Sequence, residues 1–127
     1  MMNNKGQTLV IFVLILPLIL LIISILFSYG NLLLTKKQIE NNIVYTINYY
    51  FDHEYENKNE SNMEEIKSKL KYIIEKNIKY DNLIIEIKDD SIDISIEKQI
   101  NNLFVNKNII INYYGYLFNS EKVIKRR

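Results

Sequence analysis

An uninterrupted apolar run, residues 8–27, limits the possible folds of this chain more than any other feature. Twenty helical residues at about 1.5 Å each span about 30 Å, which is the thickness of the hydrocarbon core of a bilayer. A core helix of a soluble protein would carry a polar face, but here only Thr8, Pro17 and Ser24 interrupt the Leu, Ile, Val and Phe residues. The run therefore predicts a membrane-spanning helix.

Length and charge leave room for one small domain after this helix. The chain has 127 residues, enough for one span and a single exposed domain. The residues after Asn31 carry fifteen Lys and Arg and fifteen Asp and Glu, so that domain has no basic surface for nucleic acid, which is not an expected partner. The absence of Cys excludes disulfides and thiol chemistry.

Three interpretations compete for the first thirty residues. A secretory signal would be cut after Gly30, where Ser28 and Gly30 supply small residues, but three leucines extend the apolar character past that cut. A plain signal anchor needs only the hydropathy. In a pilin-type leader, a short polar segment would end at Gly6, and the helix would begin with Gln7.

The third interpretation rests on a family resemblance. Residues 5–18, Lys-Gly-Gln-Thr-Leu-Val-Ile-Phe-Val-Leu-Ile-Leu-Pro-Leu, resemble the start of TadE-like proteins, the minor pilins or pseudopilins of tight-adherence (Flp-type) pilus systems. Residues 31–42 resemble the family's helix exit, and residues 109–118 resemble its late β-strand. The resemblance implies a single-pass protein of the cell membrane, with a cytoplasmic N-terminus and an extracytoplasmic domain. Its expected partners are the lipid bilayer and other pilus or envelope assembly subunits.

One position departs from the family pattern. The fifth residue after the Gly6–Gln7 junction is Ile11, where processed pilins carry Glu. A carboxylate within hydrocarbon is tolerated there because it can pair with the terminal amine of a neighbouring subunit. Because Ile11 cannot form this pair, a non-polymerising assembly subunit fits better than a fibre subunit. The segments expected are 1–6 as a leader or cytoplasmic tail, 7–30 as the transmembrane helix and 31–127 as the exposed domain.

Periodicity predicts how the exposed domain folds. An apolar stripe at Ile39, Ile43 and Ile47 extends the first helix outward to Tyr50 or Phe51. A Ser-x-x-Glu capping box at residues 61–64 precedes a second helical stripe, which predicts a helix over residues 62–78.

Strict alternation then predicts strands at residues 83–87 and 92–96, joined by a turn at Asp89 and Asp90. A third strand starts at Ile109, and Gly115 is expected to bend or end it. Residues 101–108 are expected to form a connection with room for a turn of helix.

These elements define the expected fold class: α+β and pilin-like, with a long N-terminal transmembrane helix that continues into a small domain. That domain would contain one further helix and a three-stranded antiparallel sheet. Alone it would bury only a marginal core, so the stripe of the first helix is expected to pack on it.

No catalytic site is expected. His53 is the only histidine and lies in an acidic segment, residues 52–62, that lacks the spacing and the glycine of a calcium loop. The three glycines are isolated, so no phosphate loop exists. We therefore expect no enzyme, cofactor, metal or small-molecule substrate.

Function would then rest on interaction. The candidate contact residues are three tyrosines of the late strand, Tyr113, Tyr114 and Tyr116; Ile39, Ile43 and Ile47 take their place if the stripe packs elsewhere. The preferred hypothesis is a membrane-anchored TadE-like accessory subunit for assembly of a surface pilus or related secretion apparatus. The alternatives are a secreted binding protein or adhesin released after Gly30, and an anchored domain of an unrelated envelope complex.

Overall fold

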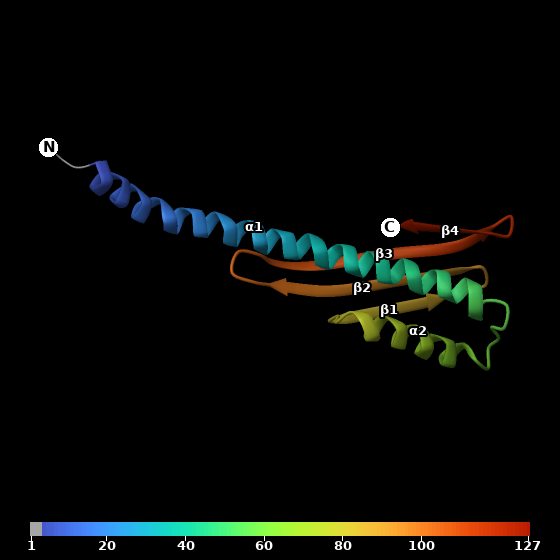
Figure 1. Ribbon diagram of the computed structural model, residues 1–127. Coiled ribbons are helices and arrows are strands. Elements are labelled where there is room, and N and C mark those ends of the chain that lie inside the picture. The colour runs from blue at the N-terminus through green and yellow to red at the C-terminus, as the bar shows by residue number, and fades with distance from the viewer. Residues whose placement is uncertain (1–3) are drawn as a thin grey trace.

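The largest element of the fold is one long N-terminal helix; the structure, a computed structural model, describes residues 4–127. Helix α1 (Asn4–Tyr49) continues directly into a short π-helix, η1 (Tyr50–Glu54). The 46 residues of α1, at about 1.5 Å each, make it about 70 Å long. Figure 1 shows the N-terminal half extending away from the domain and the C-terminal half lying along a sheet. The helix is long and apolar enough to cross a membrane, a property that a signal sequence near the N-terminus would share.

The sheet has four antiparallel strands in sequence order: β1 (Asn82–Ile87), β2 (Ser91–Asn101), β3 (Asn106–Phe118) and β4 (Glu121–Arg126). The expected hairpin of the first two strands is confirmed. The prediction of three strands is wrong, because β4 pairs with the last part of β3. Asn119 and Ser120, with φ of 51° and 67°, make the two-residue turn between these strands.

The core lies between one face of the sheet and the two helices, α1 and α2 (Met63–Asn77). Alternate residues of a strand point to the same face, so the isoleucines of β2 and β3 meet the helices together. The central members of the core are Ile39, Ile43 and Ile47 of α1, Ile66, Leu70 and Ile74 of α2, and Ile92, Ile94, Ile96, Ile109 and Ile111 of the sheet. The expected packing of the first helix on the small domain is thus confirmed, and so is a second helix close to residues 62–78.

The third strand does not end at Gly115, which was one of the two expectations for this residue. Strand β3 continues through it to Phe118, and β4 pairs along this part. The glycine instead lets α1 lie close to the sheet. A Cβ at this position would lie 2.6 Å from Cγ2 of Ile47 and 3.0 Å from Cε2 of Phe51, closer than ordinary van der Waals contact. Any larger residue would push the helix off the sheet.

Two local expectations also fail. The capping box is wrong, because Asn62 occupies the N-cap of α2 without a capping side-chain bond and the Ser61 hydroxyl donates to the Asn59 side chain instead. The connection between β2 and β3 holds no turn of helix. It is the four-residue loop 102–105, in which the Asn102 side chain accepts hydrogen bonds from the backbone N–H groups of Phe104 and Val105.

Ion pairs from β4 attach the edge of the sheet to α1 and to η1. Arg126 lies 2.8 Å from Glu40, whose side chain is largely buried, and Lys122 lies 2.7 Å from Asp52. Lys122 and Arg126 are four residues apart and therefore lie on the same face of the strand, from which Arg126 reaches α1 and Lys122 reaches η1, the continuation of α1. The strand that the sequence did not predict therefore helps to hold the first helix in place.

Candidate interaction surfaces

The predicted processing residues lie in the first turns of α1. Gly6 and Gln7 are exposed, and a side chain at Gly6 would meet no atom within 4 Å. The fold therefore gives Gly6 no packing role that would require a glycine. The first three residues of the expected leader lie outside the described residues.

The isoleucine stripe is not a free surface. Ile39, Ile43 and Ile47 are at most 1% exposed, because the sheet and α2 cover them. Of the two sets of candidate contact residues, only the tyrosines of β3 remain accessible to a partner.

Alternation along β3 divides the three candidate tyrosines. Tyr113 points toward the helices and packs on the edge of the core. Tyr114 and Tyr116 follow it by one and three residues, so both point to the opposite face of the sheet. Both are partly exposed there. The structure thus brings two of the three together on one surface, which we call the outer face of the sheet.

The two outer tyrosines form an ordered cluster with charged neighbours. Their rings stack, with centroids 6.0 Å apart and planes 14° from parallel. The guanidinium of Arg127 lies 5.0 Å from the centroid of Tyr114 and 3.0 Å from the carboxylate of Asp93 on β2. Stacking and the ion pair fix these side chains before any partner binds, so binding would order few additional groups.

The outer face also exposes apolar side chains. Ile84 on β1, Ile110 on β3 and Phe118 at the end of β3 are 50%, 62% and 63% exposed. Tyrosine, arginine and a few exposed apolar residues are the composition that protein interfaces favour over the rest of a surface. The outer face therefore carries the residue types that protein interfaces favour.

The second candidate surface is concave. It is a groove of about 1180 Å³ between α1 and α2. Its lining includes Tyr45 and Tyr72, which are 59% and 66% exposed, and Asn42, which is nearly buried. Sequence periodicity did not indicate this groove, because it depends on how far apart the two helices pack.

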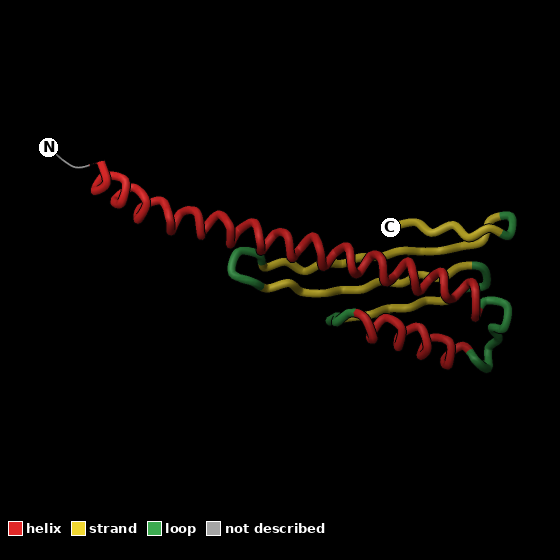
Figure 2. Tube along the Cα trace, in the orientation of Figure 1, coloured by secondary structure: helices red, strands yellow, loops and turns green. Residues whose placement is uncertain are grey.

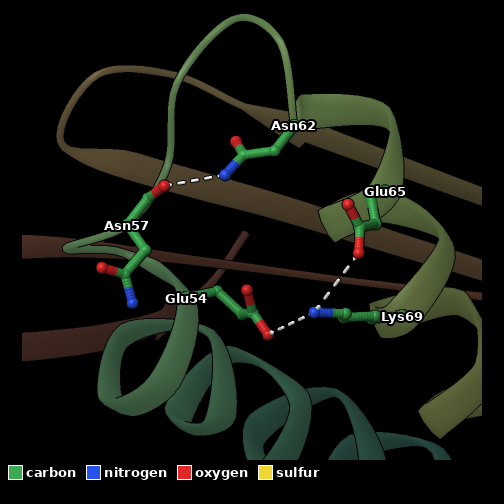
Figure 3. A network of polar contacts seen from close by, with 5 residues as sticks. All are labelled: Glu54, Asn57, Asn62, Glu65 and Lys69. Carbon is green, nitrogen blue, oxygen red and sulfur yellow. Dashed lines mark hydrogen bonds and ion pairs between the residues drawn. The ribbon is translucent and has the colours of Figure 1, made fainter.

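The acidic segment, residues 52–62, lies at the end of the domain away from the protruding half of α1 (Figure 1), and Figure 3 shows the polar contacts where it joins the two helices. The ammonium of Lys69 lies 3.5 Å from Glu54 and 3.8 Å from Glu65, and the Asn62 side chain donates to the Asn57 carbonyl at 2.8 Å. Within residues 4–127, no three His, Cys, Asp or Glu side chains gather closely enough to hold a metal ion.

Two tyrosines have a raised pKa: Tyr50 in η1, beside the acidic segment, and Tyr80, which follows the other end of α2. Burial raises the pKa of Tyr50 to about 12, and Tyr55 adds to the effect. The hydrogen bond to Glu75 raises the pKa of Tyr80 to about 12. Both shifts favour the neutral phenol, so these groups stabilise the fold rather than supply a base.

Comparison with known proteins found no family model, no curated protein and no solved structure that matches this chain. A function must therefore be argued from the residues and their geometry. The sequence pointed to Tyr114 and Tyr116, but it gave no sign of Arg127 or Asp93, because only the pairing of the strands brings these two side chains together.

Proposed function

We propose that this chain is a membrane-anchored, TadE-like accessory subunit, a minor pilin, for assembly of a surface pilus or related secretion apparatus. The observation that carries the proposal is the protruding half of α1. Every large apolar residue from Leu9 to Ile23 is between 41% and 71% exposed, and no part of the domain covers them. Exposing a continuous apolar surface of this size to water is unfavourable, whereas the hydrocarbon core of a bilayer would cover it. The helix pairs its own backbone groups, so burial in lipid would leave none of them unpaired.

The way the domain sits on the helix also supports the proposal. One helix provides both the apolar protrusion and the cover of a small antiparallel sheet, which is the general plan of pilin-like proteins. Ile11 is 54% exposed on the protruding half and offers no carboxylate to the terminal amine of a neighbour. A subunit that assists assembly, with its N-terminus cytoplasmic and its domain outside, therefore fits better than one that polymerises.

The outer face of the sheet is the surface proposed to bind partner subunits. Replacing Tyr114 and Tyr116 together by Ser should abolish binding, because it removes the stacked rings and the surface on which Arg127 lies. Tyr72→Ser on α2 is the comparison variant, since it removes a ring that is 66% exposed in the groove between α1 and α2 and so distinguishes that surface from the outer face. In cells lacking the native gene, the comparison variant should restore surface pili and the double variant should not. Equal restoration by both would refute this choice of surface.

A secreted binding protein released after Gly30 remains the second candidate, and one observation favours it. The buried core begins at Leu32, so a cut after Gly30 would leave every member of the core in the released domain. An anchored domain of an unrelated envelope complex is the third candidate.

The mature N-terminus, measured by mass spectrometry on protein from its native cells, separates these candidates. A start at Gln7 supports the pilin route, a start at Asn31 in the medium supports secretion, and an intact start in the membrane supports a plain anchor. Gly6→Val tests the first route directly. Because a side chain there meets nothing in the fold, persistence of the uncut form would report a failure of cleavage rather than of folding. Equal masses for the variant and the parent would exclude processing at Gly6.

A further inference from the structure

The loop between β2 and β3 exposes its apolar tip. Leu103 is 84% exposed, the largest value for any exposed large apolar side chain in residues 4–127. Its neighbour Val105 is buried in the same cluster as Leu32 of α1. The loop is therefore held in place at its base while its tip points away from the core.

This loop lies at the end of the domain that faces the protruding half of α1, as Figures 1 and 2 show. Ser28 and Leu32, at 7% and 6% exposed, are the first buried residues along α1. They follow the apolar run by one and five residues, or about 1.5 to 7.5 Å of helix. The polar layer of a bilayer is about 5 to 7 Å thick on each side, so this level of the helix coincides with the headgroups.

Charge separates the two ends of the domain. Residues 31–39 and 98–108, at the end with the loop, contain Lys36, Lys37, Lys98 and Lys107 and no acidic residue, and the carboxylates that contact these segments are those of Glu97 and Asp81. None of these four lysines makes an ion pair within the described part of the chain. The segments at the opposite end, residues 52–62, 88–90 and 119–121, contain seven acidic residues and two lysines. An anionic surface would therefore attract the loop end and repel the other.

We propose that the β2–β3 loop is a second membrane contact, which places Leu103 in the interfacial layer of the bilayer that holds α1 while the four lysines approach anionic lipid headgroups. This inference rests on the proposed membrane anchoring. It adds that the domain lies against the lipid surface in one orientation. The apolar tip and the four lysines both lie at the end of the domain nearest the protruding half of α1. Neither anchoring through α1 nor binding of a partner to the outer face requires this arrangement, whereas a membrane contact does.

The chain contains no tryptophan, so a single introduced tryptophan reports on its own surroundings. The full chain is reconstituted in vesicles of phosphatidylcholine, with or without phosphatidylglycerol and with lipids brominated in the upper acyl chain. Leu103→Trp is the test. Phe27→Trp, in the apolar run, reports on anchoring; Phe118→Trp, at the opposite end of the sheet, is the matched control and is 63% exposed. All three positions are exposed, so none of these substitutions disturbs the core.

The inference predicts blue-shifted, quenched emission from Leu103→Trp, comparable to that from Phe27→Trp, and unquenched emission from Phe118→Trp. Quenching at Leu103→Trp should be stronger in anionic vesicles, and Lys98→Glu with Lys107→Glu should remove this lipid dependence. Quenching of Phe27→Trp alone would overturn the membrane contact and leave the anchor standing, as expected if the tip binds another subunit. Absence of quenching at all three positions would overturn the anchoring itself. Equal quenching at Leu103 and Phe118 would show no preferred orientation and would also overturn the inference.

Discussion

Gly115→Ala should separate α1 from the sheet at one defined point. The added methyl would lie 2.6 Å from Cγ2 of Ile47, about 0.8 Å inside the 3.4 Å at which ordinary contact begins. Ile47 is fully buried and cannot swing away, so the backbone of α1 or β3 must move. Overpacking of this kind costs about 1 to 3 kcal/mol of folding free energy.

Gly30→Ala is the matched control. A Cβ at Gly30 meets nothing within 4 Å, so this substitution should stabilise the chain by about 0.5 to 1 kcal/mol through backbone entropy alone. The same entropy gain applies at Gly115, so the two variants should differ by about the overpacking cost. The measurement is denaturant unfolding of the full chain in detergent micelles, followed by the near-ultraviolet signal of its tyrosines. Equal free energies of unfolding for the two variants would refute the close approach of helix and sheet.

A double-mutant cycle identifies the clashing partner. Ile47→Ala alone should cost about 2 to 5 kcal/mol, because it leaves a cavity in the core. Combined with Gly115→Ala it should cost less than the sum of the two, because the cavity accepts the new methyl. A coupling of about 1 kcal/mol or more is expected for side chains in contact. Additive costs would mean that Ile47 is not what the methyl meets.

Three further perturbations test the anchor, the core and a buried hydroxyl. Leu20→Arg should impair membrane insertion, at a cost of about 2.5 to 3.5 kcal/mol, whereas the parent should resist high-salt and carbonate washing; its recovery in the wash would contradict anchoring. A fragment of residues 31–127 should melt cooperatively and one of residues 52–127 should not, because the second lacks the α1 part of the core; similar sharp melts in circular dichroism would contradict this. Tyr50→Phe should raise the free energy of unfolding by about 1 kcal/mol, because no described residue bonds the buried hydroxyl. The folded state holds that proton up to a pKa of about 12, above the unfolded value near 10, so stability should fall across pH 10 to 12 in the parent and fall less in the variant; identical unfolding profiles for the two would refute the assignment.

Local patterns predicted the elements that such patterns determine. The stripe through Ile39, Ile43 and Ile47 and the alternation along β1 and β2 are properties of neighbouring residues, and both are found in the fold. The capping box failed because the side chain of Asn59 accepts the Ser61 hydroxyl and the Asn62 N–H, and because Asn62 takes the N-cap position in place of Ser61.

The fourth strand could not be predicted in the same way. Val123 and Ile124 are adjacent between lysines and do not alternate, and the turn at Asn119 and Ser120 lacks the usual glycine. Pairing with β3 determines this strand, and lysines are typical of an exposed sheet edge. The cluster of Tyr114, Tyr116, Arg127 and Asp93 on the outer face could not be predicted for the same reason. Arg127 follows β4 directly, so the pairing of β4 with β3 places it beside Tyr114.

Helix α1 contains two residues of types at which helices bend, Pro17 in the apolar run and Gly30 just before the part packed on the sheet. Gly30 is exposed and carries no side chain to stiffen the helix. The two residues nearest to it on the buried side, Ser28 and Leu32, are both covered, so the domain holds the helix before and after the glycine. The same packing therefore holds α1 on both sides of Gly30. Under the proposed anchoring, the position of the outer face would follow from how α1 sits in the membrane.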